Sequence, residues 1–235
     1  MILWTTQDEY VYQMIMKSGV YRCEFQYSFI SDSPMAYDWL VAQMTKRISP
    51  PPAGVTYPVW AWHTWEGARR KTDLRRERWQ YGPRGDRYYC MEIEILDKEV
   101  LLSDYDTWHM VLNNWFITNT REEDEEYDRL EEQLPPEALQ LLKEKNWEGV
   151  FDLTPVNNDW TRRGDSIQAT FWELRKDQVR DVRMFTAANK ITSCANNAVR
   201  LAKKAALQEP DPFTPGMLEQ LIRQIEVRAQ EESKV

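Results

Sequence analysis

The sequence predicts an α+β fold, built on one mixed or antiparallel sheet with helices and a helical segment at the C-terminus. Apolar and polar residues alternate over 59–65, 88–95 and 167–174, and this period of two is typical of half-buried strands. Apolar residues recur at helical spacing over 37–48. Because strands and helices do not alternate regularly along the chain, the pattern does not favour a parallel α/β sheet.

The 235 residues are expected to form one α+β domain over 1–186 and a C-terminal helical extension over 187–235. The extension is predicted as two helices, an alanine-rich one over 186–208 and a second over 214–230. The segment 209–212 separates them because it holds two prolines, which end helices.

The elements of the first 65 residues begin and end at recognisable signals. Thr6 and Glu9 have the spacing of a capping box at a helix start, and Gly19 is a natural end for that helix. Ser33 followed by Pro34 is a typical start for the next helix. The expected elements are a strand at 2–5, a helix at 7–18, a strand at 20–23, a helix at 34–48 and a strand at 59–65.

The second half of the domain is interpreted by the same rules. Ser103 or Asp104 is expected to cap a helix that carries Trp108 and Trp115. A turn near Lys176 is expected to join the last two strands as a hairpin. The expected elements are a strand at 88–96, the capped helix to 115, a charged helix at 121–134, a helix at 135–145, a strand at 167–174 and its hairpin partner at 179–185.

The composition excludes several classes of protein. A hydrophobic content of 42% and a charged content of 29% are typical of a globular protein rather than a disordered one. The sequence has no run of 18 apolar residues and no signal-peptide pattern, so no membrane partner is expected. Cys23, Cys90 and Cys194 are far apart and odd in number, which favours a cytoplasmic location over a disulfide framework.

Charge is distributed unevenly along the chain. The net charge of −8 disfavours attraction of nucleic acid to the whole surface. Residues 66–87 have eight basic and four acidic side chains, a local net charge of +4, while 122–132 is almost wholly acidic. Nucleic acid is therefore expected as a partner only through the 69–87 segment.

Both histidines lie beside tryptophans, of which the chain has eleven. His63 lies within Trp60–Trp65, and His109 follows Trp108. Such clusters build either a core or an aromatic-walled pocket, and histidine titrates near neutral pH. Asp106 and His109 have helical spacing, so they form either an oriented general base or an ordinary surface contact.

Glu173 is the candidate catalytic carboxylate. Alternation places it on the strand face that carries Ile167 and Phe171. A carboxylate on an apolar face must be paired, protonated or at an exposed strand end. Glu173 is therefore either a strand-end residue or a catalytic group at a cleft edge, with Gln168 as its hydrogen-bonding neighbour.

The basic segment interleaves arginines with aromatic residues, among them Trp79 and Tyr81. Guanidinium groups bind phosphate bidentately and aromatic rings stack on bases, so Arg75, Arg76 and Arg78 are candidate phosphate ligands. The alternative is a solvated flap that balances the acidic 122–132 segment. No metal is expected, because the sequence has two histidines, no cysteine cluster and no nucleotide-binding or hydrolase motif.

Five segments carry a resemblance to known proteins: Leu3–Gln7, Ala36–Leu40, Tyr57–Trp62, Leu101–His109 and Ile167–Glu173. They resemble an uncharacterised bacterial family called domain of unknown function 3841. The similarity spans about 1–186 and implies a bacterial or phage origin, but no activity.

The order of a short first strand, helices and a late strand with Gln168 and Glu173 also resembles ADP-ribosyltransferase-like proteins. That resemblance implies NAD as cofactor, Glu173 as the glutamate that supports attack on the nicotinamide ribose, and aromatic walls for the nicotinamide. Two departures are visible: the first strand has no histidine or arginine, and Phe171 replaces the family's usual glutamine or glutamate.

Two function classes follow from these observations. The first is an NAD- or nucleotide-using transferase of the ADP-ribosyltransferase-like type, with Glu173, His109 and His63 as catalytic candidates. Glu173 and at least one histidine are then expected within about 10 Å of each other beside one pocket. The expected binding residues are Trp60, Trp62, Trp108, Gln168, Arg75, Arg76 and Arg78.

The alternative is a non-catalytic interaction module, such as an antitoxin, an inhibitor or a phage–host factor. The acidic 122–132 segment would present a negative surface to a partner. The C-terminal helices would contribute an apolar stripe that needs a covering surface. The residues of this stripe are Met217, Leu218, Leu221, Ile222 and Ile225.

Overall fold

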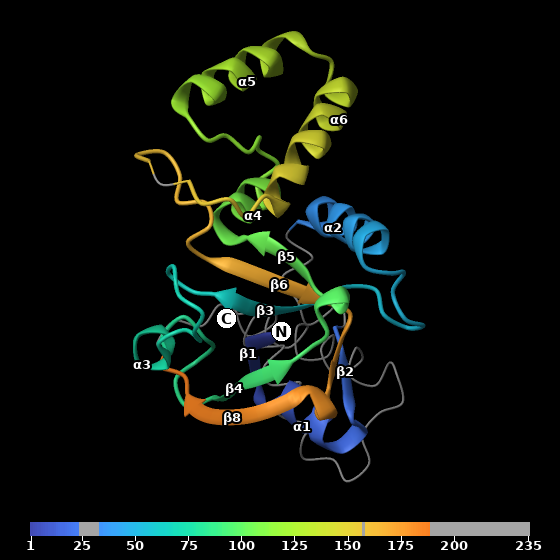
Figure 1. Cartoon of the computed structure of the whole chain (residues 1–235), viewed down its shortest axis with the longest axis vertical. Helices are drawn as coiled ribbons and strands as arrows, with labels where there is room; N and C mark the ends of the chain where they lie inside the picture. The colour runs from blue at the N-terminus through green and yellow to red at the C-terminus, as the bar shows by residue number, and fades with distance from the viewer. Residues whose placement is uncertain (24–32, 157, 189–235) are drawn as a thin grey trace, which may run out of the picture. The chain divides into compact units, whose positions relative to one another are not determined.

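The structure is a computed structural model that describes residues 1–23, 33–156 and 158–188 (Figure 1). It confirms the α+β fold. Six strands form one sheet in the order β5–β6–β3–β1–β4–β8, and β2 and β7 form a second sheet. The strands are β1 (Ile2–Asp8), β2 (Val20–Arg22), β3 (Val59–Thr64), β4 (Arg87–Glu94), β5 (Leu101–Asp104), β6 (Ile167–Phe171), β7 (Glu173–Arg175) and β8 (Val179–Thr186).

The α-helices of the described residues agree in type with those expected, apart from the short α3 within the basic segment. None of these helices is long and apolar enough to cross a membrane. The two helices predicted after residue 186 fall outside the described residues. The described helices are α1 (Glu9–Ser18), α2 (Pro34–Arg47), α3 (Leu74–Glu77), α4 (Tyr105–Leu112), α5 (Arg121–Gln133) and α6 (Pro136–Asn146).

The chain divides into two compact units. The expected boundary between 186 and 187 stays a prediction, because the structure describes the chain only to residue 188. The first unit comprises Met1–Thr5, Val20–Thr72 and Met91–Asp181, and the second comprises Thr6–Gly19, Asp73–Cys90 and Val182–Val235.

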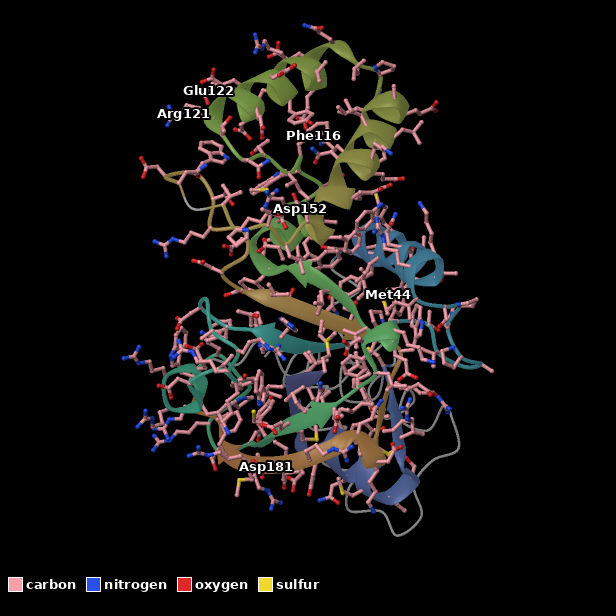
Figure 2. All side chains as sticks on the ribbon, in the orientation of Figure 1. Met44, Phe116, Arg121, Glu122, Asp152 and Asp181 are labelled. Carbon is pink, nitrogen blue, oxygen red and sulfur yellow. The ribbon has the colours of Figure 1, made fainter. Side chains whose placement is uncertain are left out.

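The core of the first unit forms where α2, α4 and the turn at 147–151 pack together. Met44 on α2 (Figure 2) and Trp147 are fully buried, and Val111 on α4 joins the same cluster. The rings of Trp39 and Trp147 meet edge to face, with centroids 5.6 Å apart. The helical spacing of apolar residues over 37–48 thus gives α2 its buried face.

Two of the buried indoles, those of Trp147 and Trp172, have partners for their N–H groups. Trp147 Nε1 donates to the carbonyl oxygen of Trp115 at 2.7 Å, and Trp172 Nε1 donates to that of Ser49 at 3.1 Å. Burying a polar group without a partner is costly, so these bonds permit burial of the whole side chain. Part of the tryptophan set therefore builds a core.

The second unit contains α1 and α3. Asp8 caps α1 by accepting the N–H of Val11 at 2.9 Å, so the helix begins two residues later than predicted. The reason is that β1 continues through Asp8. The rings of Tyr12 and Tyr89 stack with centroids 3.9 Å apart, which joins α1 to the first half of β4.

One strand prediction is wrong, and it bears on the candidate site. The expected strand 167–174 divides at Trp172 into β6 and β7, which belong to different sheets. β7 pairs with β2, and β8 lies beside β4, so the expected hairpin between 167–174 and 179–185 does not form. The hydrogen bond from Trp172 to Ser49 holds the chain at the division.

Gly164 offers a test of the turn that precedes β6. Its φ is +90°, and an added Cβ would lie 2.9 Å from Pro155 Cα and 3.3 Å from the Leu153 carbonyl oxygen. We expect Gly164→Ala to lower the free energy of unfolding by about 2–4 kcal/mol, measured by urea denaturation.

Gly54→Ala is the matched control for this substitution. Gly54 has a φ of +79°, but an added Cβ there would meet no atom within 4 Å. It should therefore show only the cost of the left-handed backbone, about 1–2 kcal/mol. Equal losses for the two variants would contradict the close contact at Gly164.

Candidate functional site

Three neighbouring strands present aromatic and polar side chains on one face of the sheet. Trp62 is paired with Gln168, and Trp60 with Thr170. On the other side of β6, Ser103 is also paired with Gln168. Because directly opposed residues share a face, these five side chains lie side by side in the first unit.

Helix α4 packs over this face because of its N-cap. Asp104 is fully buried and accepts the N–H of Thr107 at 2.9 Å. The backbone N–H of Tyr105 also donates to Ser166 at the start of β6, at 2.9 Å. The expected cap by Ser103 or Asp104 is thus resolved in favour of Asp104, the residue whose carboxylate reaches the first turn.

The packing of α4 brings Trp108 against Trp60, with ring centroids 5.2 Å apart. Trp108 is 3% exposed, and Tyr37 from α2 meets both rings edge to face. These two tryptophans were expected to line a binding site. They instead form the inner end of an aromatic cluster, whose outer end is more exposed.

The outer end is a set of four rings, which we call the aromatic platform: Trp62, Trp65, Tyr105 and His109. Centroid distances are 4.5 Å for Trp62–Trp65, 5.1 Å for Trp62–Tyr105 and 4.4 Å for Tyr105–His109. Three of the rings are partly exposed, and His109 is exposed. Such a surface can stack against a flat ligand without any change in the core.

His109 is oriented by its own helix. Its Nδ1 lies 2.8 Å from the carbonyl oxygen of Tyr105, four residues earlier. A carbonyl oxygen only accepts hydrogen bonds, so Nδ1 carries a proton and Nε2 is the proton acceptor in the neutral ring. Asp106 lies on the same helix, and the pKa of its carboxyl is raised by desolvation and by the charge of Asp104.

Three polar atoms on the covered sheet face lack hydrogen-bond partners among the described residues. They are Trp60 Nε1, Ser103 Oγ and Gln168 Oε1, all of them buried. An unsatisfied buried polar atom costs on the order of 1–3 kcal/mol. A polar group that reached this face would form hydrogen bonds with these atoms and remove that cost.

Glu173 lies elsewhere in the first unit. It is paired with Arg22 of β2, and its carboxylate accepts a hydrogen bond from Arg22 Nε at 2.7 Å. Five residues separate it from Gln168, a length of up to about 17 Å along an extended strand. The apolar-face carboxylate is thus paired, one of the arrangements expected for it.

The register also separates Glu173 from both histidines. β6 pairs with β3 so that Phe171 faces Val59, at the opposite end of β3 from His63. His109 follows the start of α4, which is bonded to Ser166 before β6. The register therefore places Glu173 and the two histidines toward opposite ends of β3 and β6, and a pocket shared by them stays a prediction.

His63 follows Trp62 on β3, at the point where the pairing with β6 shifts register between Trp62 and Thr64. Its Nδ1 lies 2.9 Å from Thr64 Oγ1, and its carbonyl oxygen accepts a hydrogen bond from Arg69. Burial, reinforced by the positive charge of Arg69, lowers the pKa of His63 to about 4. This histidine is neutral at physiological pH and separate from the platform.

Arg75, Arg76 and Arg78 belong to the second unit, in and beside α3. The first two are strongly exposed, with side-chain exposures of 87% and 83%. No group of three His, Cys, Asp or Glu side chains is placed to hold a metal ion in the described part of the chain.

Tyr105 was not expected at the site, and Trp65 was expected there only as the last residue of the Trp60–Trp65 strand. Tyr105 precedes His109 by four residues, a spacing that places two side chains on one helix face. That spacing is visible once the helix start at Asp104 is known. Trp65 follows β3 and could be linked to the site only through the turn that bonds it to Ala68 at 2.9 Å.

The lowered pKa of His63 predicts a pH-dependent stability. The unfolded chain binds a proton near pH 6.5, whereas the folded protein resists protonation until about pH 4. Stability is therefore complete above about pH 6.5 and falls as the pH drops toward 4. Urea unfolding at several pH values should show a flatter dependence for His63→Gln than for the parent.

The direct measurement is an NMR titration of the two imidazole rings. His63 should keep its neutral chemical shifts down to about pH 4. A His63 midpoint near the value of a free imidazole would contradict the burial argument, whatever the urea data show.

Comparison with known proteins gives one family relationship. No curated protein and no solved structure shows a significant match to the chain. The model of one family, described as Domain of unknown function (DUF3841), matches residues 2–180, which is most of the chain. The match covers every strand that contributes to the aromatic platform and its sheet face. The chain therefore belongs to the DUF3841 family.

Proposed function

We propose that the protein binds a nucleotide, with NAD as the first candidate, by stacking a flat ring on the aromatic platform. The observation that carries this proposal is the cluster of Trp62, Trp65, Tyr105 and His109 with centroids 4.4–6.4 Å apart and rings partly open to solvent. Stacking of a base on an aromatic side chain contributes about 1–3 kcal/mol, so a few such rings can hold a nucleotide.

Polar groups next to the platform support a nitrogen-containing ring over a purely apolar one. Gln168 is the cross-strand partner of Trp62, and its side-chain oxygen is an acceptor without a partner among the described residues. Ser103, paired with the same residue, adds a hydroxyl. A ring amide or a base edge carries the matching donors and acceptors.

The reaction class we propose is transfer of ADP-ribose from NAD. In such a reaction the bond between nicotinamide and the ribose C1 breaks, and nicotinamide leaves with the bonding electrons. An acceptor nucleophile bonds to C1 and gives its proton to a base. Nε2 of His109 is a base beside the platform, with Asp106 on the same helix.

Glu173 remains a catalytic candidate by its resemblance to the ADP-ribosyltransferase glutamate. Its ion pair with Arg22 offers a structural role instead. The Arg22 side chain is 46% exposed and that of Glu173 only 16%, but glutamine keeps an oxygen that can accept from Arg22, so Glu173→Gln should leave the fold intact. The two roles can therefore be separated by measuring activity and stability on one variant.

Calorimetric titration with NAD tests binding at the platform. Trp62→Ala should weaken NAD binding about tenfold or more, because it removes the central ring, and Trp62→Phe should restore most of the affinity. Trp160→Phe changes a tryptophan outside the platform and should bind as the parent does. No binding of NAD by the parent, or equal binding by Trp62→Ala, would contradict the proposal.

NAD consumption tests the reaction. If Glu173 is catalytic, Glu173→Gln should lower the rate at least about 100-fold while NAD still binds. A rate equal to that of the parent would show that the Glu173 assignment is wrong. His109→Ala should lower the rate by a similar factor, if His109 is the base.

The second candidate function is a protein-interaction module, and helix α5 favours it. No residue of α5 is buried, and eight of its thirteen residues are acidic. Figure 2 shows Arg121 and Glu122 at its first turn and Phe116 between α5 and α6. Tyr127 stacks on Phe116 at 4.0 Å and Glu131 pairs with Lys143 at 2.6 Å, so one side of α5 attaches to the unit while Glu125 and Glu126 stay exposed.

Charge neutralisation on α5 tests this alternative. Glu125→Gln with Glu126→Gln should weaken a stoichiometric complex with a basic partner, and added salt should weaken it further. The control, Glu137→Gln with Asp159→Asn, removes the same charge outside α5. Equal binding by the two double variants would contradict a role for α5, and loss on truncation after Glu209 would point to the C-terminal residues.

A further inference from the structure

We propose that the segment Asp73–Arg87 is a binding surface for single-stranded nucleic acid. Its arginines would contact phosphates, and Trp79 would stack on an unpaired base. The proposal concerns the second unit only. It does not depend on NAD binding at the aromatic platform, so either proposal can fail without the other.

The segment carries positive charge that its acidic side chains do not neutralise. Arg75 and Arg76 are 87% and 83% exposed, and both reach a single carboxylate, that of Asp73, at 3.4 and 3.9 Å. Arg78 and Arg84 are also exposed, and neither forms an ion pair with another described residue. Two of these four guanidinium groups therefore share one carboxylate, and the other two have no ion-pair partner among the described residues.

The remaining charged residues of the segment change its excess of positive charge little. Arg87 is held by Glu9 at 2.5 Å and is not counted as a phosphate ligand. The Glu77 carboxylate accepts a hydrogen bond from Gln80, and Asp86 is the remaining acid. The segment still has more basic than acidic groups at its surface, which suits a polyanion.

Trp79 presents its indole ring to solvent. Its side chain is 59% exposed, although burial of an indole is strongly favourable. The neighbouring rings behave differently: Tyr81 of the segment and Tyr88, which follows it, pack with Phe185, with centroids 5.1 and 5.9 Å away. Trp79 is thus the ring that the segment presents beside its arginines.

Hydrogen bonds hold the backbone of the segment in one conformation. The carbonyl oxygen of Arg78 accepts the N–H of Ala188 at 2.9 Å, and that of Asp86 accepts the N–H of Ala187 at 2.9 Å. Gly82 donates to Tyr88 Oη at 3.1 Å. These bonds fix the chain on both sides of Trp79, which lowers the entropy cost of ordering the surface on binding.

A single strand fits these observations better than a duplex. Three of the arginines and Trp79 lie within residues 75–79, and the chain outside Asp73–Arg87 carries a net charge of −10, which opposes a long duplex. Stacking on Trp79 needs a base that is not already paired and stacked. The expected ligand is therefore a short stretch of single-stranded DNA or RNA.

Fluorescence anisotropy with labelled oligo(dT) and oligo(rU) of about twelve nucleotides tests the proposal on the whole chain. The parent should bind with a dissociation constant of about 100 µM or lower at low salt. Arg75→Ala with Arg76→Ala should bind more weakly, and the slope of log affinity against log salt should become shallower by about 1.4. A matching duplex should bind more weakly than either single strand.

Variants at Trp79 separate stacking from charge. Trp79→Ala should weaken binding about tenfold with the salt slope unchanged, and Trp79→Phe should retain most of the affinity. Arg121→Ala with Arg129→Ala removes the same charge from α5 and should leave binding unchanged.

Three results would overturn the proposal. The first is no binding of either single strand by the parent. The second is binding that the Arg75/Arg76 and Arg121/Arg129 double variants weaken equally, since that would indicate net charge alone. The third is equal binding of duplex and single strand that Trp79→Ala leaves unchanged.

Discussion

The buried carboxylate of Asp104 is the contact on which the candidate site depends. One oxygen accepts the N–H of Thr107 at 2.9 Å and the other accepts the N–H of Gly164 at 2.7 Å. The first bond sets where α4 begins, and the second ties the turn before β6 to the same point. Tyr105 and His109 follow from that helix start, so their position over the sheet is a consequence of one side chain.

The indole N–H groups divide the tryptophans into two classes. Trp147 and Trp172 are bonded to backbone carbonyl oxygens and belong to the core. Trp60 has no partner for its N–H among the described residues, and it lies where the core meets the platform. Some tryptophans therefore build the core and others form an aromatic surface, the two roles that the sequence left open.

The sequence predicted the parts of the site that depend on local periodicity. Alternation along β3 puts Trp60 and Trp62 on one face, and helical spacing from Asp104 brings Trp108 over them. The sequence placed Glu173 on the same strand as Gln168, whereas β6 ends at Phe171 and Glu173 begins β7. Local alternation does not show where a strand ends. The division at Trp172 depends on a hydrogen bond to Ser49, 123 residues away, which no pattern within 167–174 reveals.

Local sequence patterns also do not show the environment of His63 or of the arginines. Alternation predicts that His63 faces away from Trp62, but its low pKa results from burial and from Arg69, six residues later. The exposure of Arg75 and Arg76 depends on how α3 packs, and charge counting shows only that they are basic. Residue type and spacing thus predicted candidates, whereas tertiary contacts decided which of them meet.

The close pairs of indoles have an optical consequence. Trp60 and Trp108 lie 5.2 Å apart at 41°, and Trp62 and Trp65 lie 4.5 Å apart at 75°. Transition dipoles at such separations couple, so each pair absorbs as a unit with paired circular dichroism bands of opposite sign. The Trp60–Trp108 signal exists only when α4 is seated on the sheet. The protein therefore carries an intrinsic chromophore that reports tertiary assembly of the site separately from helix and strand content.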